Sequence, residues 1–143
     1  MSQENVEIVR SLWEAWDRRD ADAIFPLYDP EVDVVPHSRE GTFMSESYHG
    51  HDGVRRWIRD WMDAFDGFYF HADEYLNAGG CVLVHATQGG RGKGSGVTVE
   101  RSLWFLYRLQ RGRIVRIETY DSKAEALEAV GLGSSASSDL ALP

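Results

Sequence analysis

Apolar residues recur at helical spacing in two segments of the first half of the chain. The first segment predicts an amphipathic helix over about residues 3–18, with a stripe formed by Val6, Val9, Trp13 and Trp16. The second predicts a helix over about residues 51–65, with a face formed by Val54, Trp57, Ile58, Trp61 and Phe65. Charged side chains lie outside both apolar faces, so we expect each helix to pack against the core with its apolar side.

Shorter elements are predicted between these two helices. ADAIFPLYD, residues 21–29, favours a short helix for which Asp20 is a suitable N-cap, although Pro26 disturbs its interior. VDVVPH, residues 32–37, is typical of a strand that Pro36 ends. The polar segment that follows is expected to be a loop.

From residue 68 onward the period changes to two, which indicates strands. The predicted strands are residues 68–76, 81–88, 97–109 and 113–120. A short closing helix is predicted at 123–132, with Gly131 just past its last turn, and residues 133–143 resemble a flexible tail. The order predicts an α+β fold, a single domain over 1–132 in which helices cover one face of a bent antiparallel sheet.

The stretch GGRGKGSG, residues 89–96, raises the question of nucleotide binding. It fails the P-loop pattern because Lys93 is followed by Gly94, and a β-branched run follows it where a phosphate-binding loop needs a helix. We therefore interpret it as the connection between two long strands.

Composition narrows the class of protein further. A net charge of −8 over 143 residues argues against nucleic-acid and anionic-membrane binding. No apolar run approaches the ~20 residues of a membrane helix, the N-terminus lacks signal-peptide features, and a single cysteine fits a cytoplasmic protein. Five Trp, six Tyr and six Phe favour an aromatic pocket, a dimer interface or both.

Several pieces, taken in order, resemble one family. They are the opening segment VRSLWEAWDRRDADAIFPLYDPEVDV, the helix entry YHGHDGVRRWI, the hairpin GRGKGSGVTVE before RSLWFLYRL, and RGRIVRIETYDSKAEALEAVGL. Together they resemble the SnoaL-like branch of the nuclear-transport-factor-2-like superfamily, which also contains ketosteroid isomerases. The resemblance implies a cone-shaped, strongly curved sheet, a homodimer and chemistry without a cofactor or metal.

The family's reactions can be compared residue by residue. Leu12 stands where ketosteroid isomerases carry a phenol, and the end of the first predicted strand offers no acid, so that mechanism is not expected. Polyketide cyclases of the SnoaL type carry an acid/base aspartate at the end of the last strand, and here that place is Asp121. The histidine often found two residues earlier in that branch is replaced by Thr119.

Asp121 is the first catalytic candidate. A two-residue turn at Arg111 and Gly112 would set Trp104 opposite Thr119, so Asp121 would lie at the end of an apolar stripe beside an indole. Desolvation there would raise the pKa of the carboxyl group into a range useful for proton transfer. The alternative is that Asp121 only caps the closing helix.

His37 and Tyr28 are the assisting candidates, as a base and a hydrogen-bond donor near the mouth of the cone. A surface histidine and a core tyrosine are the plainer interpretations. His49 and His51 form an H-x-H pair without an evident third ligand, so no metal site is predicted.

The predicted pocket wall comprises Trp13, Trp57, Trp61, Phe65, Trp104 and Thr119. The leading hypothesis is a protein that binds a small hydrophobic molecule, with cofactor-free acid/base catalysis of the cyclase, isomerase or dehydratase type as its further step. A non-catalytic ligand-binding or dimerisation module is the second hypothesis. Epoxide hydrolysis is the third, with an ion pair between Arg101 and a carboxylate as its starting point.

Overall fold

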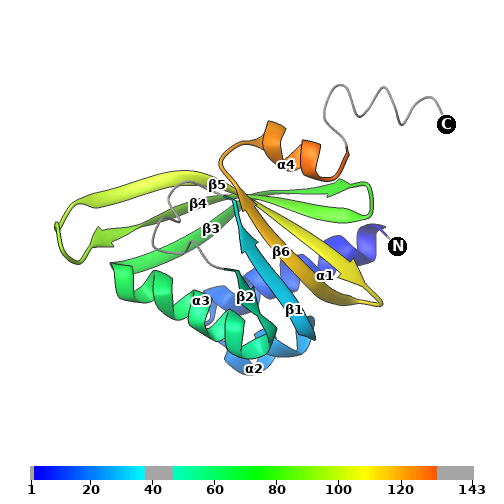
Figure 1. Cartoon of the computed structure of the whole chain (residues 1–143), viewed down its shortest axis with the longest axis horizontal. Coiled ribbons are helices and arrows are strands. Elements are labelled where there is room, and N and C mark those ends of the chain that lie inside the picture. The colour runs from blue at the N-terminus through cyan, green and yellow to red at the C-terminus, as the bar shows by residue number, and fades with distance from the viewer. Residues whose placement is uncertain (1, 38–46, 132–143) are drawn as a thin grey trace.

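Among the described residues, the fold is a strongly curved six-stranded sheet with four helical segments on one side and one helix on the other (Figure 1). The computed structural model describes residues 2–37 and 47–131. The helical elements are α1 (Ser2–Asp17), α2 (Ala21–Ile24), the 3-10 turn η1 (Phe25–Leu27), α3 (Gly50–Ala64) and α4 (Lys123–Ala129). The strands are β1 (Tyr28–Pro36), β2 (Tyr48–His49), β3 (Phe65–Ala78), β4 (Cys81–Gly92), β5 (Thr98–Gln110) and β6 (Arg113–Tyr120).

The strands follow the order β2-β1-β6-β5-β4-β3. All neighbouring pairs are antiparallel except β1 and β6, which run parallel. The predicted α+β class and curved sheet are confirmed. The expected 133–143 tail lies outside the described residues.

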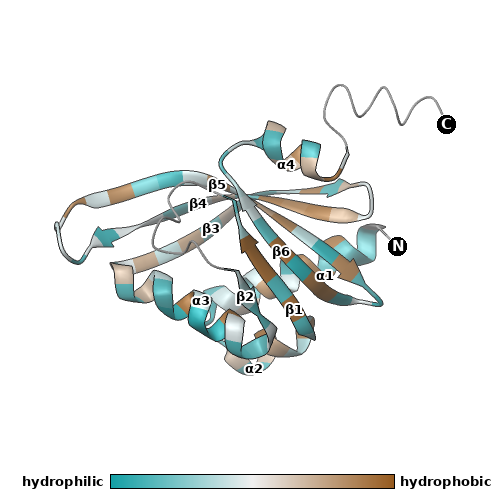
Figure 2. Ribbon diagram, in the orientation of Figure 1, coloured by the Kyte–Doolittle hydropathy of each residue, from teal (hydrophilic) through white to brown (hydrophobic). Residues whose placement is uncertain are grey.

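The inner face of the sheet carries the main core, against which α1 and α3 pack. Phe105, Leu103 and Val84 are almost fully buried there. Apolar positions along β1 and β5 are visible in Figure 2. Successive side chains of a strand point to opposite faces, so each strand can supply apolar residues to both sides of the sheet.

The outer face carries a second, smaller core under α4. Leu83, Leu106 and Trp104 pack there with Ala126 of the helix. Ser122 is the N-cap of α4 and accepts a hydrogen bond from the Glu125 amide at 3.2 Å. The predicted cap at the second helix is also confirmed, since the Asp20 carboxylate accepts from the Ala23 amide.

Two register predictions are resolved by the β5–β6 hairpin. The two-residue turn is confirmed, because Arg111 and Gly112 have φ angles of 53° and 77°, both in the left-handed region. The pairing beyond it was predicted incorrectly, because a bulge next to Arg108 shifts the register by one residue. Trp104 therefore faces Tyr120, and Phe105 faces Thr119.

Candidate functional site

An aromatic cavity of about 50 Å³ lies between the helices and the inner face of the sheet. Its walls come from α1, α2, α3 and strands β1, β3 and β5. The lining side chains are Leu12, Trp13, Trp16, Ile24, Tyr28, Trp57, Ile58, Trp61, Phe68, Phe70, Phe105 and Tyr107. None of the twelve carries a formal charge at neutral pH, so the surface of the cavity is almost entirely apolar.

The rings of this wall meet mostly edge to face. Phe70 makes such contacts with Trp13, Trp61 and Phe105, at centroid separations of 5.9, 5.6 and 5.2 Å. Aromatic pairs favour this arrangement because a positive ring edge meets a negative ring face. The wall is therefore an interlocked set of rings.

A buried hydrogen bond joins two of the lining residues. The Trp13 indole nitrogen, Nε1, donates to the Tyr107 hydroxyl oxygen at 3.0 Å. These residues are far apart in sequence, so the bond ties α1 to β5 across the core. It also leaves the hydrogen of the Tyr107 hydroxyl available as a donor, since among the described residues no acceptor is bound to it.

Burial controls the protonation of the two lining phenols. Desolvation raises the pKa of Tyr28 and the pKa of Tyr107 well above that of free tyrosine. Both side chains therefore stay protonated at neutral pH, so each hydroxyl keeps a hydrogen that it can donate and neither can serve as a base.

Asp121 lies at the far end of the inner face. Its carboxylate is 3.6 Å from an Arg101 terminal nitrogen, and both side chains are partly exposed. Arg101 shares the inner face with Phe105, because the two residues lie four apart on an unbroken stretch of β5. Asp121 is absent from the cavity wall, and the N-cap of α4 is Ser122, not Asp121.

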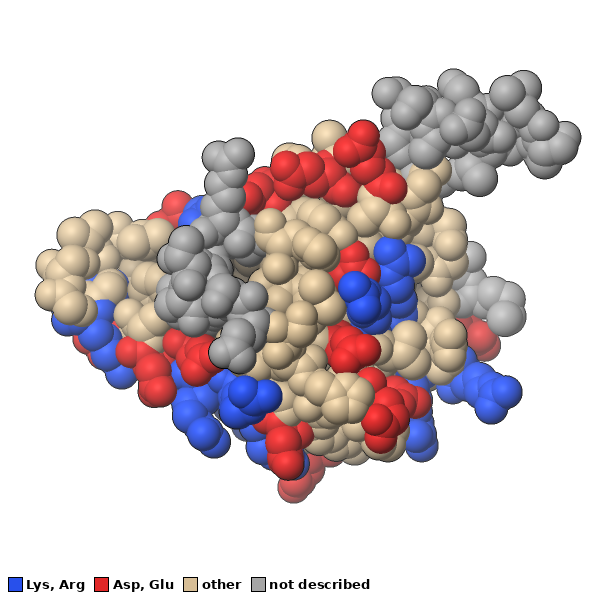
Figure 3. Space-filling view, viewed as in Figure 1, with Lys and Arg blue, Asp and Glu red and all other residues tan. Residues whose placement is uncertain are grey.

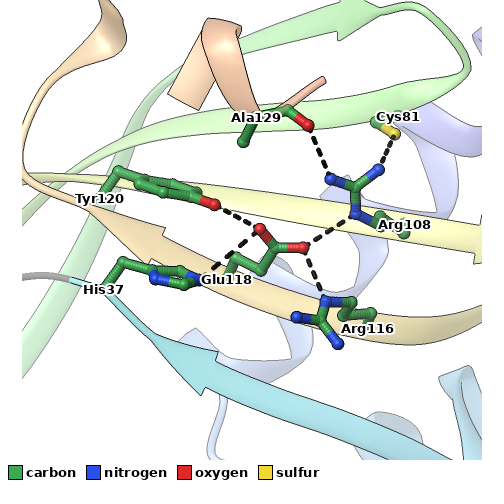
Figure 4. A network of polar contacts seen from close by, with 7 residues as sticks. All are labelled: His37, Cys81, Arg108, Arg116, Glu118, Tyr120 and Ala129. Carbon is green, nitrogen blue, oxygen red and sulfur yellow. Dashed lines mark hydrogen bonds and ion pairs between the residues drawn. The ribbon is translucent and has the colours of Figure 1, made fainter. Parts of the chain in front are cut away.

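His37 lies in a polar cluster around Glu118, next to the outer face (Figure 4). Its ring stacks on Tyr120 with a centroid separation of 4.8 Å, and its Nε2 is 3.9 Å from a Glu118 oxygen. Tyr28 begins β1 whereas His37 follows its last residue, so the strand's length, roughly 25–30 Å, separates them. The structure therefore does not bring Tyr28 and His37 together.

Glu118 is only 5% exposed and is held by three donors. The Nε atoms of Arg108 and Arg116 each donate to one carboxylate oxygen at 2.8 Å, and the Tyr120 hydroxyl donates to the other. Burial alone would raise the pKa of Glu118, but these hydrogen bonds outweigh it and lower the pKa. Arg108 also donates to the Ala129 carbonyl at 3.0 Å, which ties the cluster to α4.

The sequence model of the SnoaL-like domain matches residues 9–117, most of the chain. The chain belongs to the SnoaL-like family. None of the curated protein sequences matches it.

Solved structures share this fold along almost their whole length. A nuclear-transport-factor-2-like protein from Burkholderia thailandensis superposes with a TM-score of 0.74 at 24% identity, over 86% of this chain and 96% of that one. TerC, co-crystallised with polyporic acid, gives 0.71 at 19% identity, over 89% and 98%. A candidate polyketide cyclase from Sinorhizobium meliloti gives 0.63 at 26% identity, over 83% and 98%.

The predicted pocket residues of this SnoaL-like protein fall into three groups. Trp13, Trp57 and Trp61 line the cavity, as does Tyr28. Phe65 stacks on Trp61 at 6.1 Å, just behind the wall. Trp104 and Thr119 lie away from it.

The positions of these last two residues follow from the hairpin. Trp104 lies on the outer face of β5, where it stacks on His85 at 4.5 Å, and the extra β6 residue of the bulge beside Arg108 places Thr119 on the inner face instead of opposite Trp104. Thr119 is 2% exposed and pairs with Phe105, but it does not line the cavity. A wrong register therefore misplaced the indole that was expected beside Asp121.

Two features of the site were missed at the level of sequence. Tyr107 and Phe105 could have been found from the alternation along β5, because positions 103, 105 and 107 share one face. The Glu118 cluster joins β1, β5, β6 and α4, and nothing in the local sequence signals it.

The two histidines of the H-x-H pair make different contacts. His49 bridges Asp33 and Glu31 through its two ring nitrogens, at 2.7 and 2.9 Å, whereas the His51 Nε2 lies 3.0 Å from the Tyr28 carbonyl oxygen. Within residues 2–37 and 47–131, no group of three metal-ligating side chains is found, and no helix is long and apolar enough to span a membrane.

Proposed function

We propose that this SnoaL-like protein binds a small hydrophobic molecule in the aromatic cavity, without a cofactor or metal. The observation that supports this function is a wall of twelve uncharged side chains, nine of which are Trp, Phe or Tyr. TerC, with its polyporic acid, and a candidate polyketide cyclase share the fold, which is consistent with organic ligands for this architecture.

The size of the cavity limits the ligand. About 50 Å³ is a third of the ~150 Å³ cavity that admits benzene in another protein. A single ring therefore enters by displacing the lining residues that are only half-buried, Trp16, Ile58 and Phe70. The ligand that fits best is one small ring or a short apolar chain.

Benzene is a direct probe of this proposal. It should raise the melting temperature, because a ligand that binds only the folded state adds roughly 2.7 kcal/mol at a hundred times its Kd. Ile58→Trp should narrow the cavity and remove the shift. Met62→Trp, on the exposed side of the same helix, should keep it. A melting temperature unaffected by benzene in the wild type would contradict the proposal.

Acid/base catalysis by Asp121 is the second candidate, favoured by its ion pair with Arg101 on the inner face. An arginine and one carboxylate are also part of what an epoxide hydrolase needs. We expect Asp121→Asn to lower turnover of a cavity ligand by at least ~100-fold with its Kd unchanged, while Asp63→Asn on the exposed surface of α3 has no effect. Unchanged turnover in Asp121→Asn would exclude Asp121 as the acid/base and leave only the proposed binding function.

A further inference from the structure

The polar atoms of the cavity wall are mostly hydrogen-bond donors. The Trp16 indole nitrogen is buried and has no hydrogen-bond partner among the described residues. Tyr107 already accepts from Trp13 through its oxygen, and its own hydrogen remains to be donated. Tyr28 adds a third protonated group, for which no hydrogen bond by the hydroxyl is found among the described residues.

Buried donors without acceptors are unfavourable, since each loses its bonds to water and gains none. A ligand that brings an acceptor removes this penalty, whereas a hydrocarbon of the same shape leaves it in place. The Tyr107 hydroxyl is the stronger candidate for the contact, because accepting a hydrogen bond from Trp13 polarises its O–H group.

The charge of the wall restricts the kind of acceptor. No arginine, lysine or histidine is among the twelve lining residues, so a carboxylate or phosphate would be buried without a counter-ion. An alcohol or amine would bring a hydrogen of its own into a wall that already has three donors. A neutral carbonyl group accepts hydrogen bonds and donates none.

We infer that the cavity selects a small neutral carbonyl compound, such as a cyclic ketone, and holds its oxygen through the Tyr107 hydroxyl with Tyr28 or Trp16 as a second donor. This inference rests on the proposed binding function and adds the chemical class of the ligand.

A pair of probes with one shape separates the two proposals. Cyclopentanone and methylenecyclopentane differ in having C=O or C=CH2, and their dissociation constants can be measured by the fluorescence of the lining tryptophans. Each dissociation constant is corrected for the transfer of that probe from water to a hydrocarbon solvent, because the alkene leaves water more readily than the ketone. After this correction we expect the ketone to bind roughly tenfold more tightly. Equal corrected affinities would overturn the carbonyl inference and leave the binding function standing. No binding of either probe would overturn both.

Infrared spectroscopy of the wild-type complex tests the contact without a mutation. The C=O stretch of bound cyclopentanone should fall below its frequency in a hydrocarbon solvent, because hydrogen bonding weakens the bond. A frequency equal to that in hydrocarbon would overturn the inference, even if the ketone binds.

Substitutions assign the donor. Tyr107→Phe should weaken ketone binding by roughly tenfold and restore a higher C=O frequency, with methylenecyclopentane affected much less. Tyr75→Phe is the matched control, since Tyr75 is a half-buried tyrosine outside the cavity wall. Equal loss for both probes in Tyr107→Phe would mean that the residue only shapes the cavity.

Discussion

At the scale of single residues, the glycine-rich stretch is explained by close packing against β3. Gly89 lies under the Tyr69 ring, whose hydroxyl donates to Glu100 at 2.5 Å. A Cβ on Gly90 would lie 2.9 Å from the Phe65 Cβ and 3.3 Å from the Phe68 Cα. β4 therefore extends to Gly92, through half of the segment that the sequence suggested was only a connection.

The packing around this glycine-rich stretch predicts different effects of the same substitution at Gly90 and at Gly94. Gly90→Ala should destabilise the protein by about 1–3 kcal/mol, because the new methyl group meets a rigid Cβ and backbone atoms. Gly94→Ala is the control, since nothing lies within 4 Å of its Cβ position. Urea unfolding measures both, and equal stabilities would contradict the packing argument.

Glu118 predicts a loss of stability in acid. Its folded-state pKa is lowered, so its contribution is present above the unfolded-state pKa of about 4.5 and is lost as the pH falls through the folded value. Glu118→Gln should destabilise the protein by about 2–3 kcal/mol at neutral pH, because it removes charge-assisted hydrogen bonds.

Unfolding free energies measured from pH 7 to pH 3 test this assignment. The difference between wild type and Glu118→Gln should shrink as the pH falls. Glu125→Gln, on the exposed side of α4, should give a curve parallel to that of the wild type. A constant difference for Glu118→Gln would show that its ionisation is not linked to folding.

At the scale of elements, a single bulge decides which face of the last hairpin carries which chemistry. Leu109 pairs with Ile114, as expected for a regular two-residue turn. Opposite Arg108, β6 then carries one extra residue, so the β6 side chains beyond it point to the other face of the sheet than they would in a regular hairpin. Glu118 and Tyr120 come to share the outer face with Trp104, while Phe105 and Tyr107 stay with the inner core. A shift of one residue is enough because side chains alternate along a strand.

The start of α4 predicts distinct roles for two adjacent residues. Ser122→Ala should destabilise the protein by about 1 kcal/mol, because the Glu125 amide loses its side-chain acceptor. Asp121→Asn should leave this cap intact. Thermal unfolding compares the two variants, and a larger loss of stability in Asp121→Asn would reverse the assignment of the cap.

At the scale of the whole molecule, the two faces of the sheet are covered unequally. α1 and α3 cover the inner face, whereas among the described residues α4 covers only part of the outer one (Figure 1). Acidic side chains gather over α4 in the space-filling view (Figure 3). The paired strands near Ser102 and Thr87 are left open on the outer side.

This uncovered face supports a homodimer, which remains a proposal. Sedimentation at micromolar concentration should give a species of twice 16.2 kDa. Ser102→Arg should shift the equilibrium to the monomer if a second copy packs on this face, because like charges would meet across the two-fold axis. Asp63→Arg on α3 is the control. A 16.2 kDa species in the wild type would contradict the proposal.

The sequence alone missed β2 and placed the first residues of β1 in a helix, but it determined the longer helices and strands, their order and the α+β class. These depend on local periodicity, caps and turns, such as the Asp20 cap and the Arg111–Gly112 turn, which residues near in sequence specify. It also identified three of the tryptophans that line the cavity, since the apolar face of a helix is the face that packs on the core.

Only the tertiary structure decided which polar groups meet. The bond from Trp13 to Tyr107 spans 94 positions, the Glu118 cluster joins three strands and a helix, and Asp121 is paired with Arg101 on another strand. These contacts depend on register and on a bulge. Both are set by the balance of packing over the whole sheet, and no local pattern in the sequence carries that information.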